Sequence, residues 1–135
     1  MKLLNFPDYF TQFYGVPRTN TAMGLAAWCE DYPSPVTFLE PLLYGPNILP
    51  QGNSNHAELD DPTVNKAIEE ASAIPIDRPA AEQAWIDANK LATETAPWIP
   101  VHWFLDDEVV SDKVVGAYWH QYYAAIDWPN VGVKS

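Results

Sequence analysis

The residues with the clearest chemical potential are two adjacent carboxylates, Glu30 and Asp31, which lie between the aromatic side chains of Trp28 and Tyr32. A carboxylate screened by aromatic rings lies in a reduced dielectric, where a charge-assisted hydrogen bond to an ammonium group is stronger than in water. Neighbouring residues on a strand point to opposite faces, which suits a hydrolase poorly because two carboxylates must flank one substrate. The pattern therefore indicates cation binding rather than catalysis.

From the residues alone, Asp31 is better interpreted as a turn acid that caps the following helix than as a ligand contact. Cys29 is interpreted as a small buried apolar residue, since no histidine is near it in sequence. As the only cysteine, it excludes an internal disulfide. His56, His102 and His120 lack the close spacing of metal ligands. No catalytic residue, metal or cofactor is expected.

The composition excludes several classes of partner. Seven basic residues against 18 acidic ones give a formal charge of −11, which argues against nucleic acid and anionic membrane surfaces. No apolar run approaches the ~18 residues of a membrane span, so membrane insertion is not expected. With 135 residues, 47% of them hydrophobic, the chain has the composition of a globular domain.

Four helices are predicted around the acidic pair. Aromatic residues at helical spacing predict a short helix over residues 5–15. A capping box of Thr37 and Glu40 predicts a helix over residues 37–44, with Pro41 tolerated in its first turn. Asp61 and the following proline predict a helix start. The apolar repeat over residues 77–96 predicts the longest helix.

Three strands are predicted. The apolar run over residues 22–28 favours a buried strand that ends at the acidic pair. Residues 98–105 alternate with period two, with Ile99, Val101, Trp103 and Leu105 on one face, and residues 108–118 predict a further strand. The order of elements is α/β or α+β. Three short strands form a thin sheet for so many large apolar side chains, so we expect further strands outside this chain.

Ordered motifs resemble the extracytoplasmic solute-binding proteins of peptide ABC transporters, the oligopeptide, dipeptide and nickel-binding family. They are Trp28-Cys29-Glu30-Asp31-Tyr32-Pro33 with Phe38-Leu39, Asp60-Asp61-Pro62, the helix at residues 78–96, Ala96-Pro97-Trp98-Ile99-Pro100-Val101 and Val115-Gly116-Ala117-Tyr118. The resemblance runs from about residue 2 to residue 133 and covers the last quarter or so of a family member.

The resemblance implies an α/β fold that is part of the C-terminal lobe of a two-lobed protein, with an incomplete sheet and packed helices. Residues 1–118 would form part of the second lobe, and residues 119–135 would return to the first. The chain is therefore expected to be a fragment. Its implied partners are a peptide ligand, an ABC permease and the remainder of the two-lobed protein, outside the cytoplasm.

The resemblance also implies a binding site. Asp31 matches the family aspartate that binds the α-ammonium of a peptide, and Tyr118 matches a tyrosine near the cleft that has a ligand or a core role. The main chain of Ala27 and Cys29 would bond to the extended peptide backbone. Trp28 and Tyr32 would complete the site. Leu25 departs from the pattern, because some members carry an arginine there that receives the peptide carboxylate.

Two alternatives stay open at this level. Some members of the same family carry nickel complexes, haem or oligosaccharides instead of peptides. The surplus of tryptophan and tyrosine is also typical of a carbohydrate-binding or protein-interaction module that does not depend on a free amino terminus. Trp103, Trp119 and Trp128 are interpreted as core or lobe packing rather than as a stacking platform.

Overall fold

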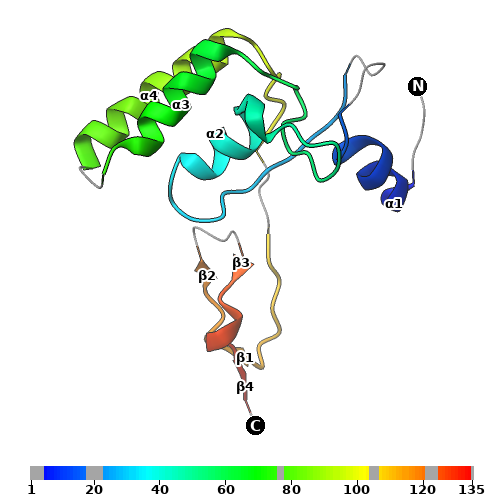
Figure 1. The fold of residues 1–135 in the computed structure, drawn as a ribbon. Coiled ribbons are helices and arrows are strands. Elements are labelled where there is room, and N and C mark those ends of the chain that lie inside the picture. The colour runs from blue at the N-terminus through cyan, green and yellow to red at the C-terminus, as the bar shows by residue number, and fades with distance from the viewer. Residues whose placement is uncertain (1–4, 18–22, 76–77, 104–106, 121–124, 135) are drawn as a thin grey trace.

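The computed structural model describes residues 5–17, 23–75, 78–103, 107–120 and 125–134. A cluster of helices comes first along the chain, and short hairpins follow it (Figure 1). The elements are α1 (Phe6–Tyr9), the π-helix η1 (Phe10–Tyr14), α2 (Val36–Leu43), the 3-10 helix η2 (Gly45–Asn47), α3 (Pro62–Ala73), α4 (Arg78–Glu94), β1 (Val114–Val115), β2 (Trp119–His120), β3 (Ala125–Ile126), the 3-10 helix η3 (Trp128–Asn130) and β4 (Gly132–Val133).

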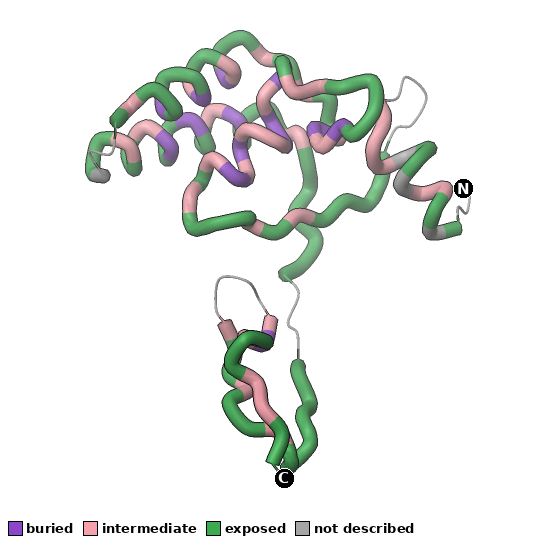
Figure 2. Tube along the Cα trace, turned by 60° about the horizontal axis from the view of Figure 1, so that its bottom comes forward, coloured by how far each residue is buried: buried purple, intermediate pink, exposed green. Residues whose placement is uncertain are grey.

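The core lies between α2, α3 and α4. The apolar faces predicted for α3 and α4 are the faces that are buried, and α3 lies along α4 with α2 packed against both (Figures 1 and 2). The Asp61 carboxylate accepts hydrogen bonds from the Thr63 and Val64 amides at 2.8 and 3.1 Å, which confirms the predicted cap. The buried residues of this cluster are Leu39, Leu42, Leu43, Val64, Ile68, Ala71, Trp85, Ala88 and Ala92.

The predicted start of α2 is wrong. The helix begins at Val36, and Pro35 rather than Thr37 occupies the N-cap position. The Thr37 hydroxyl donates to the Ser34 carbonyl at 2.9 Å instead of accepting from a helix amide. Pro41 is the sixth helical residue and therefore lies beyond the first turn, where every amide normally donates to the carbonyl four residues earlier.

Buried asparagines shape the connection between α2 and α3, which was predicted as a loop. Asn55 is fully buried. Its side-chain amide donates to the Leu59 carbonyl at 2.8 Å, and its side-chain oxygen accepts from the Leu59 amide at 3.0 Å. Asn53 donates to the Asn55 carbonyl at 3.0 Å. The Asn53 main-chain amide donates to the Gly15 carbonyl at 3.0 Å, which attaches the first helical segment to this loop.

The strands predicted over residues 22–28, 98–105 and 108–118 are mostly absent from the described residues. Residues 23–28 and 98–103 run without a ladder partner, and only Val114–Val115 of the third segment pairs. Most of their side chains are exposed, for example those of Met23 at 79%, Val101 at 72% and Trp103 at 92%. Leu105 lies outside the described residues. A strand needs a neighbour for its backbone groups, and none lies beside these segments within the described ranges.

Two small antiparallel pairs follow instead. In one, β1 pairs with β4, with Val114 opposite Val133, and in the other β2 pairs with β3, with Trp119 opposite Ile126. Residues after 118 had no clear period, so β2, β3 and β4 were not predicted. The boundary placed at 118 stays a prediction, although β1 and β4 pair across it. Within the described ranges, no helix combines the length and the apolar character needed to cross a bilayer.

Candidate functional site

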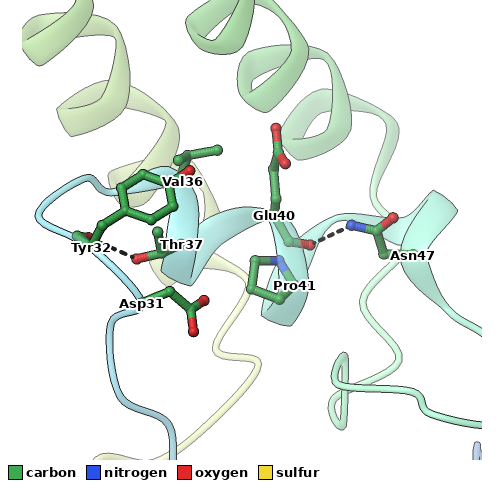
Figure 3. Close-up of a pocket in the computed structure, with 7 residues that line it drawn as sticks. All are labelled: Asp31, Tyr32, Val36, Thr37, Glu40, Pro41 and Asn47. Carbon is green, nitrogen blue, oxygen red and sulfur yellow. Dashed lines mark hydrogen bonds between the residues drawn. The ribbon is translucent and has the colours of Figure 1, made fainter.

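Asp31 borders a surface hollow of about 270 Å³ beside α2. Figure 3 shows the Asp31 carboxylate next to the Pro41 ring, with Tyr32 over the start of the helix. The hollow thus brings together the acidic turn, the first two turns of α2 and the beginning of the loop that follows. Its lining residues are Asp31, Tyr32, Val36, Thr37, Glu40, Pro41 and Asn47.

Asp31 and its neighbours are more exposed than the sequence predicted. Asp31 and Cys29 are exposed, and 54% of Tyr32 is accessible to solvent. The interpretation of Cys29 as a buried residue is therefore wrong. The reduced dielectric expected around Asp31 is also not supplied by Trp28 and Tyr32 in this chain. Among the described residues, no basic side chain forms an ion pair with Asp31, so its negative charge faces solvent.

A second carboxylate, Glu40, lies on α2 at the same hollow. Its Oε1 accepts a hydrogen bond from the Ser72 hydroxyl on α3 at 2.8 Å, and its side chain points away from Asp31 in Figure 3. The Asn47 side chain donates to the Glu40 main-chain carbonyl at 2.9 Å. Glu40 and Asn47 therefore line the hollow and bond to other residues of the chain. The Asp31 carboxylate is the charged group at the hollow that is best placed to bind a ligand. Sequence reasoning assigned neither Glu40 nor Asn47 to the site.

Trp28 fastens the acidic turn to α2. It is half-buried and packs against the helical core, and its indole Nε1–H donates to the Thr37 carbonyl at 2.8 Å. On the other side of Asp31, Ser34 accepts at its carbonyl from the Thr37 amide at 3.1 Å and from the Thr37 hydroxyl. The candidate acid therefore lies in a segment that is attached to one helix residue from both directions.

The segment before Trp28 is held along one edge by the first helical segment. The Tyr9 hydroxyl donates to the Leu25 carbonyl, and the Tyr14 hydroxyl donates to the Ala27 carbonyl. Carbonyls two residues apart point to the same edge of an extended chain. One lone pair of the Ala27 carbonyl is therefore already used, and a peptide would have to share it. The predicted main-chain contacts of Ala27 and Cys29 stay a prediction.

The sequence predicted the aromatic face of the first helix. It did not predict that this face would hold the segment before Trp28 and contact the loop after α2. Tyr9 and Tyr14 lie with their ring centroids 5.6 Å apart. The Tyr14 ring also lies 4.1 Å from the His56 ring, which belongs to the asparagine-rich loop. Burial raises the pKa of Tyr14, so the hydroxyl stays protonated and remains a donor at neutral pH.

Tyr118 lies elsewhere, directly before β2, and does not line the hollow beside Asp31. Its hydroxyl donates to the Asp127 carboxylate. A second hollow of about 370 Å³ is present in this region, and its lining residues are His120, Ala125, Ile126, Asp127, Trp128 and Pro129. Of the predicted site residues, Asp31 and Tyr32 line the first hollow, and Tyr118 lines neither of the two. Their role in binding a ligand stays a prediction.

Three further tryptophans that were interpreted as packing residues lie at the surface of this chain. Trp103, Trp119 and Trp128 are 92%, 41% and 65% exposed, so they are not core residues of this chain. Among the residues that the structure describes, no three histidine, cysteine or carboxylate side chains gather where a metal ion would bind.

No protein-family model matches the chain, and a search of curated proteins found no significant match. Among solved structures, the chain is similar to one described as "Clavulanic acid biosynthesis oligopeptide binding protein 2", with a TM-score of 0.80 and 30% sequence identity. The match covers 99% of this chain and 25% of that protein, so the chain spans a quarter of its length. As expected from the sequence, the chain therefore has the fold of one piece of an oligopeptide-binding protein, with packed helices and an incomplete sheet.

Proposed function

We propose that this chain contributes the amino-terminal anchor of a peptide-binding site, in which the Asp31 carboxylate receives the α-ammonium group of the peptide. The observation that carries the proposal is the position of Asp31, an exposed carboxylate at the rim of a hollow, which pairs with no basic side chain among the described residues. The similarity of the whole chain to an oligopeptide-binding protein supports the same class of ligand.

The charge of the molecule favours this assignment. The formal net charge of −11 produces a negative potential that attracts cationic groups. Every peptide with a free amino terminus carries such a group, so an ammonium anchor gives affinity without reading side-chain identity. The proposed role is binding without catalysis, because the second carboxylate at the hollow, Glu40, is directed to Ser72.

We further propose that the chain works as part of a longer, two-lobed solute-binding protein that delivers peptides to an ABC permease outside the cytoplasm. The exposed apolar segment around Val101 and Trp103 supports a larger assembly, because side chains of this kind are normally covered. The 25% coverage of the oligopeptide-binding protein agrees with this arrangement. Closure of the two lobes around the peptide would then exclude water and supply the reduced dielectric that Asp31 lacks in this chain.

The experiment is an NMR titration of the 135-residue chain with trialanine and with N-acetyl-trialanine. An anchor from one lobe should bind weakly, with a dissociation constant on the order of millimolar. We expect trialanine to shift the amide resonances of residues 27–34, and the acetylated peptide, which has no ammonium group, to leave them unchanged. Asp31→Asn should abolish the difference between the two peptides.

Glu30→Gln is the matched control. It removes the same charge one residue away, so it should weaken trialanine binding only through the general potential and should preserve the preference for the free amine. Equal responses to both peptides in the unmodified chain, or equal losses in the two variants, would show that Asp31 is not the anchor.

One observation favours a second candidate, an aromatic binding module. Trp103 and Trp128 are exposed, and flat exposed indoles are suited to stacking on sugars or on a protein partner. This function predicts binding of glycans with no dependence on a free amino terminus and no response to Asp31→Asn. A glycan titration that shifts the indole resonances of these two tryptophans would favour it over peptide capture.

A further inference from the structure

We infer that Trp28 is a positioning residue for Asp31. Its indole N–H donates the hydrogen bond to the Thr37 carbonyl that the amide of residue 41 would donate if that residue were not proline. The role assigned to Asp31 rests on the proposed function. The hydrogen bond itself rests on the geometry of three residues, Trp28, Thr37 and Pro41, and it can be tested without any ligand.

Pro41 leaves a backbone carbonyl of α2 without its helical donor. In an α-helix the amide of each residue donates to the carbonyl four residues earlier, so the amide of residue 41 would donate to Thr37. Proline has no amide hydrogen, and its ring also pushes the carbonyl four residues earlier away from the helix axis. Thr37 is only 5% exposed, so water is not an adequate substitute partner for its carbonyl.

The Trp28 indole supplies the missing donor to the Thr37 carbonyl. Its Nε1–H donates to the Thr37 carbonyl at 2.8 Å, a normal length for a strong N–H···O bond. The ring is half-buried against the helical core, which fixes the direction of the donor. A phenylalanine at this position keeps an apolar ring but offers no donor. Pro41 and Trp28 therefore act together on the Thr37 carbonyl, although they are 13 positions apart in the sequence.

Asp31 lies at the midpoint of the segment that Thr37 holds. Residues 28 and 34 are both bonded to Thr37, the first through the indole and the second through the Thr37 amide at 3.1 Å and hydroxyl at 2.9 Å. Three residues on either side then connect Asp31 to a buried point of the helix. A short loop with two fixed ends restricts where its central carboxylate can go, and such preorganisation raises affinity by lowering the entropy lost on binding.

The hydrogen bond is tested by exchange of the Trp28 indole proton in the full chain. The chain has six tryptophans, and the Trp28 resonance is the one that disappears in Trp28→Phe. Pro41→Ala restores an amide at residue 41, which competes for the Thr37 carbonyl in a helix that alanine favours. We expect the Trp28 indole to exchange at least about tenfold faster in Pro41→Ala. The exposed Trp128 indole should be unchanged. Equal exchange of the Trp28 indole in both proteins overturns the inference.

The positioning role is tested by separating stability from binding. Trp28→Phe should lower the melting temperature and reduce trialanine affinity by about three- to tenfold. In the double variant Trp28→Phe, Pro41→Ala, the amide of residue 41 satisfies the Thr37 carbonyl, so the melting temperature should recover. The affinity should stay low, because residue 28 then has no hydrogen bond to Thr37. Recovery of affinity together with stability would mean that Trp28 acts only on the fold.

The two proposals fail in different ways. If the unmodified chain does not distinguish trialanine from N-acetyl-trialanine, the proposed function is wrong and the positioning role falls with it. The exchange measurement still decides whether the Trp28 bond replaces the missing Pro41 amide. If the unmodified chain does distinguish the peptides and Trp28→Phe binds as well as it does, the positioning role alone is wrong.

Discussion

Tyr118 and Asp127 share a hydrogen bond whose strength depends on pH. The Tyr118 hydroxyl and the Asn130 side-chain amide, the latter at 2.9 Å, both donate to the same Asp127 oxygen. These two bonds, the tyrosine first, hold the pKa of Asp127 below its usual 3.8. A carboxyl with a lowered pKa in the folded state stabilises the fold above its unfolded pKa. That contribution is lost as the pH falls through the folded pKa.

The predicted outcome is a hairpin region that weakens in acid through Asp127. In Tyr118→Phe, the pKa of Asp127 should rise toward its usual value, as followed by the carboxyl carbon resonance. The same bond raises the pKa of Tyr118 above 10.0, so the pair's contribution is also lost as the pH rises through that raised pKa. Tyr32→Phe, at the other hollow, is the control and should leave Asp127 unchanged. An identical Asp127 midpoint in all three proteins would contradict this.

Single residues differ in how far the sequence predicts their roles. Asp61 before Pro62 was predicted as a cap and is one, because an acid at this position needs only the next two or three amides to act. Thr37 has an equally good local signal and is not a cap, since a turn at Ser34 takes its hydroxyl. The Trp28 bond to Thr37 was not predicted, because it depends on how two distant segments pack.

At the level of elements, Gly45 controls how α2 connects to α3. It begins η2, and its amide donates to the Asn65 side chain at 2.8 Å, while Asn65 donates to Asp60 at 2.7 Å. A Cβ on Gly45 would lie 1.9 Å from the Asp60 carboxylate oxygen. The carboxylate must then move, and its hydrogen bond to Asn65 is lost.

We therefore expect Gly45→Ala to lower the free energy of unfolding by about 1–3 kcal/mol, measured by urea denaturation. Gly52→Ala is the matched control. A Cβ at Gly52 meets no atom within 4 Å, so only its positive φ of 70° adds a cost, of roughly 1 kcal/mol. Equal losses in the two variants would show that crowding against Asp60 does not determine the path of the chain after α2.

Helices were predicted well and strands poorly for one physical reason. The faces of α3 and α4 follow from contacts three and four residues apart, so the sequence of each helix carries its own signal. The alternation over residues 98–103 also carries a signal, but a strand forms only beside another strand. Residues 98–103 have no such neighbour among the described residues, so the apolar pattern is present and the ladder is not.

At the level of the whole molecule, the main contacts between described elements are helix with helix and strand with strand. The helical cluster and the hairpins lie apart in Figures 1 and 2, and the described residues between α4 and β1 are mostly exposed. The sequence indicated indirectly that apolar side chains would stay exposed in this chain, because a sheet of three short strands could not cover so many of them. The sequence could not indicate which surfaces stay exposed to solvent, since that depends on how the helical cluster and the hairpins are arranged.

The exposed apolar segment at residues 98–103 predicts self-association of the 135-residue chain. Ile99, Val101 and Trp103 are 75%, 72% and 92% exposed, and their backbone groups are available to pair with a second extended chain. We expect sedimentation velocity to show an average mass that rises with concentration. The double variant Val101→Thr, Trp103→Ser should reduce this rise and leave the thermal unfolding of the helices unchanged, because neither side chain belongs to their core.

Ile86→Thr is the control for apolar exposure in general. Ile86 is 41% exposed in the middle of α4, where backbone amides and carbonyls bond to each other within the helix, so its replacement should not alter association. An effect equal to that of the double variant would point to general stickiness rather than to strand pairing. A chain that stays monomeric at all concentrations would show that the exposed strand-like segment is not adhesive. The apolar surface would then no longer support the proposal that a longer protein covers it.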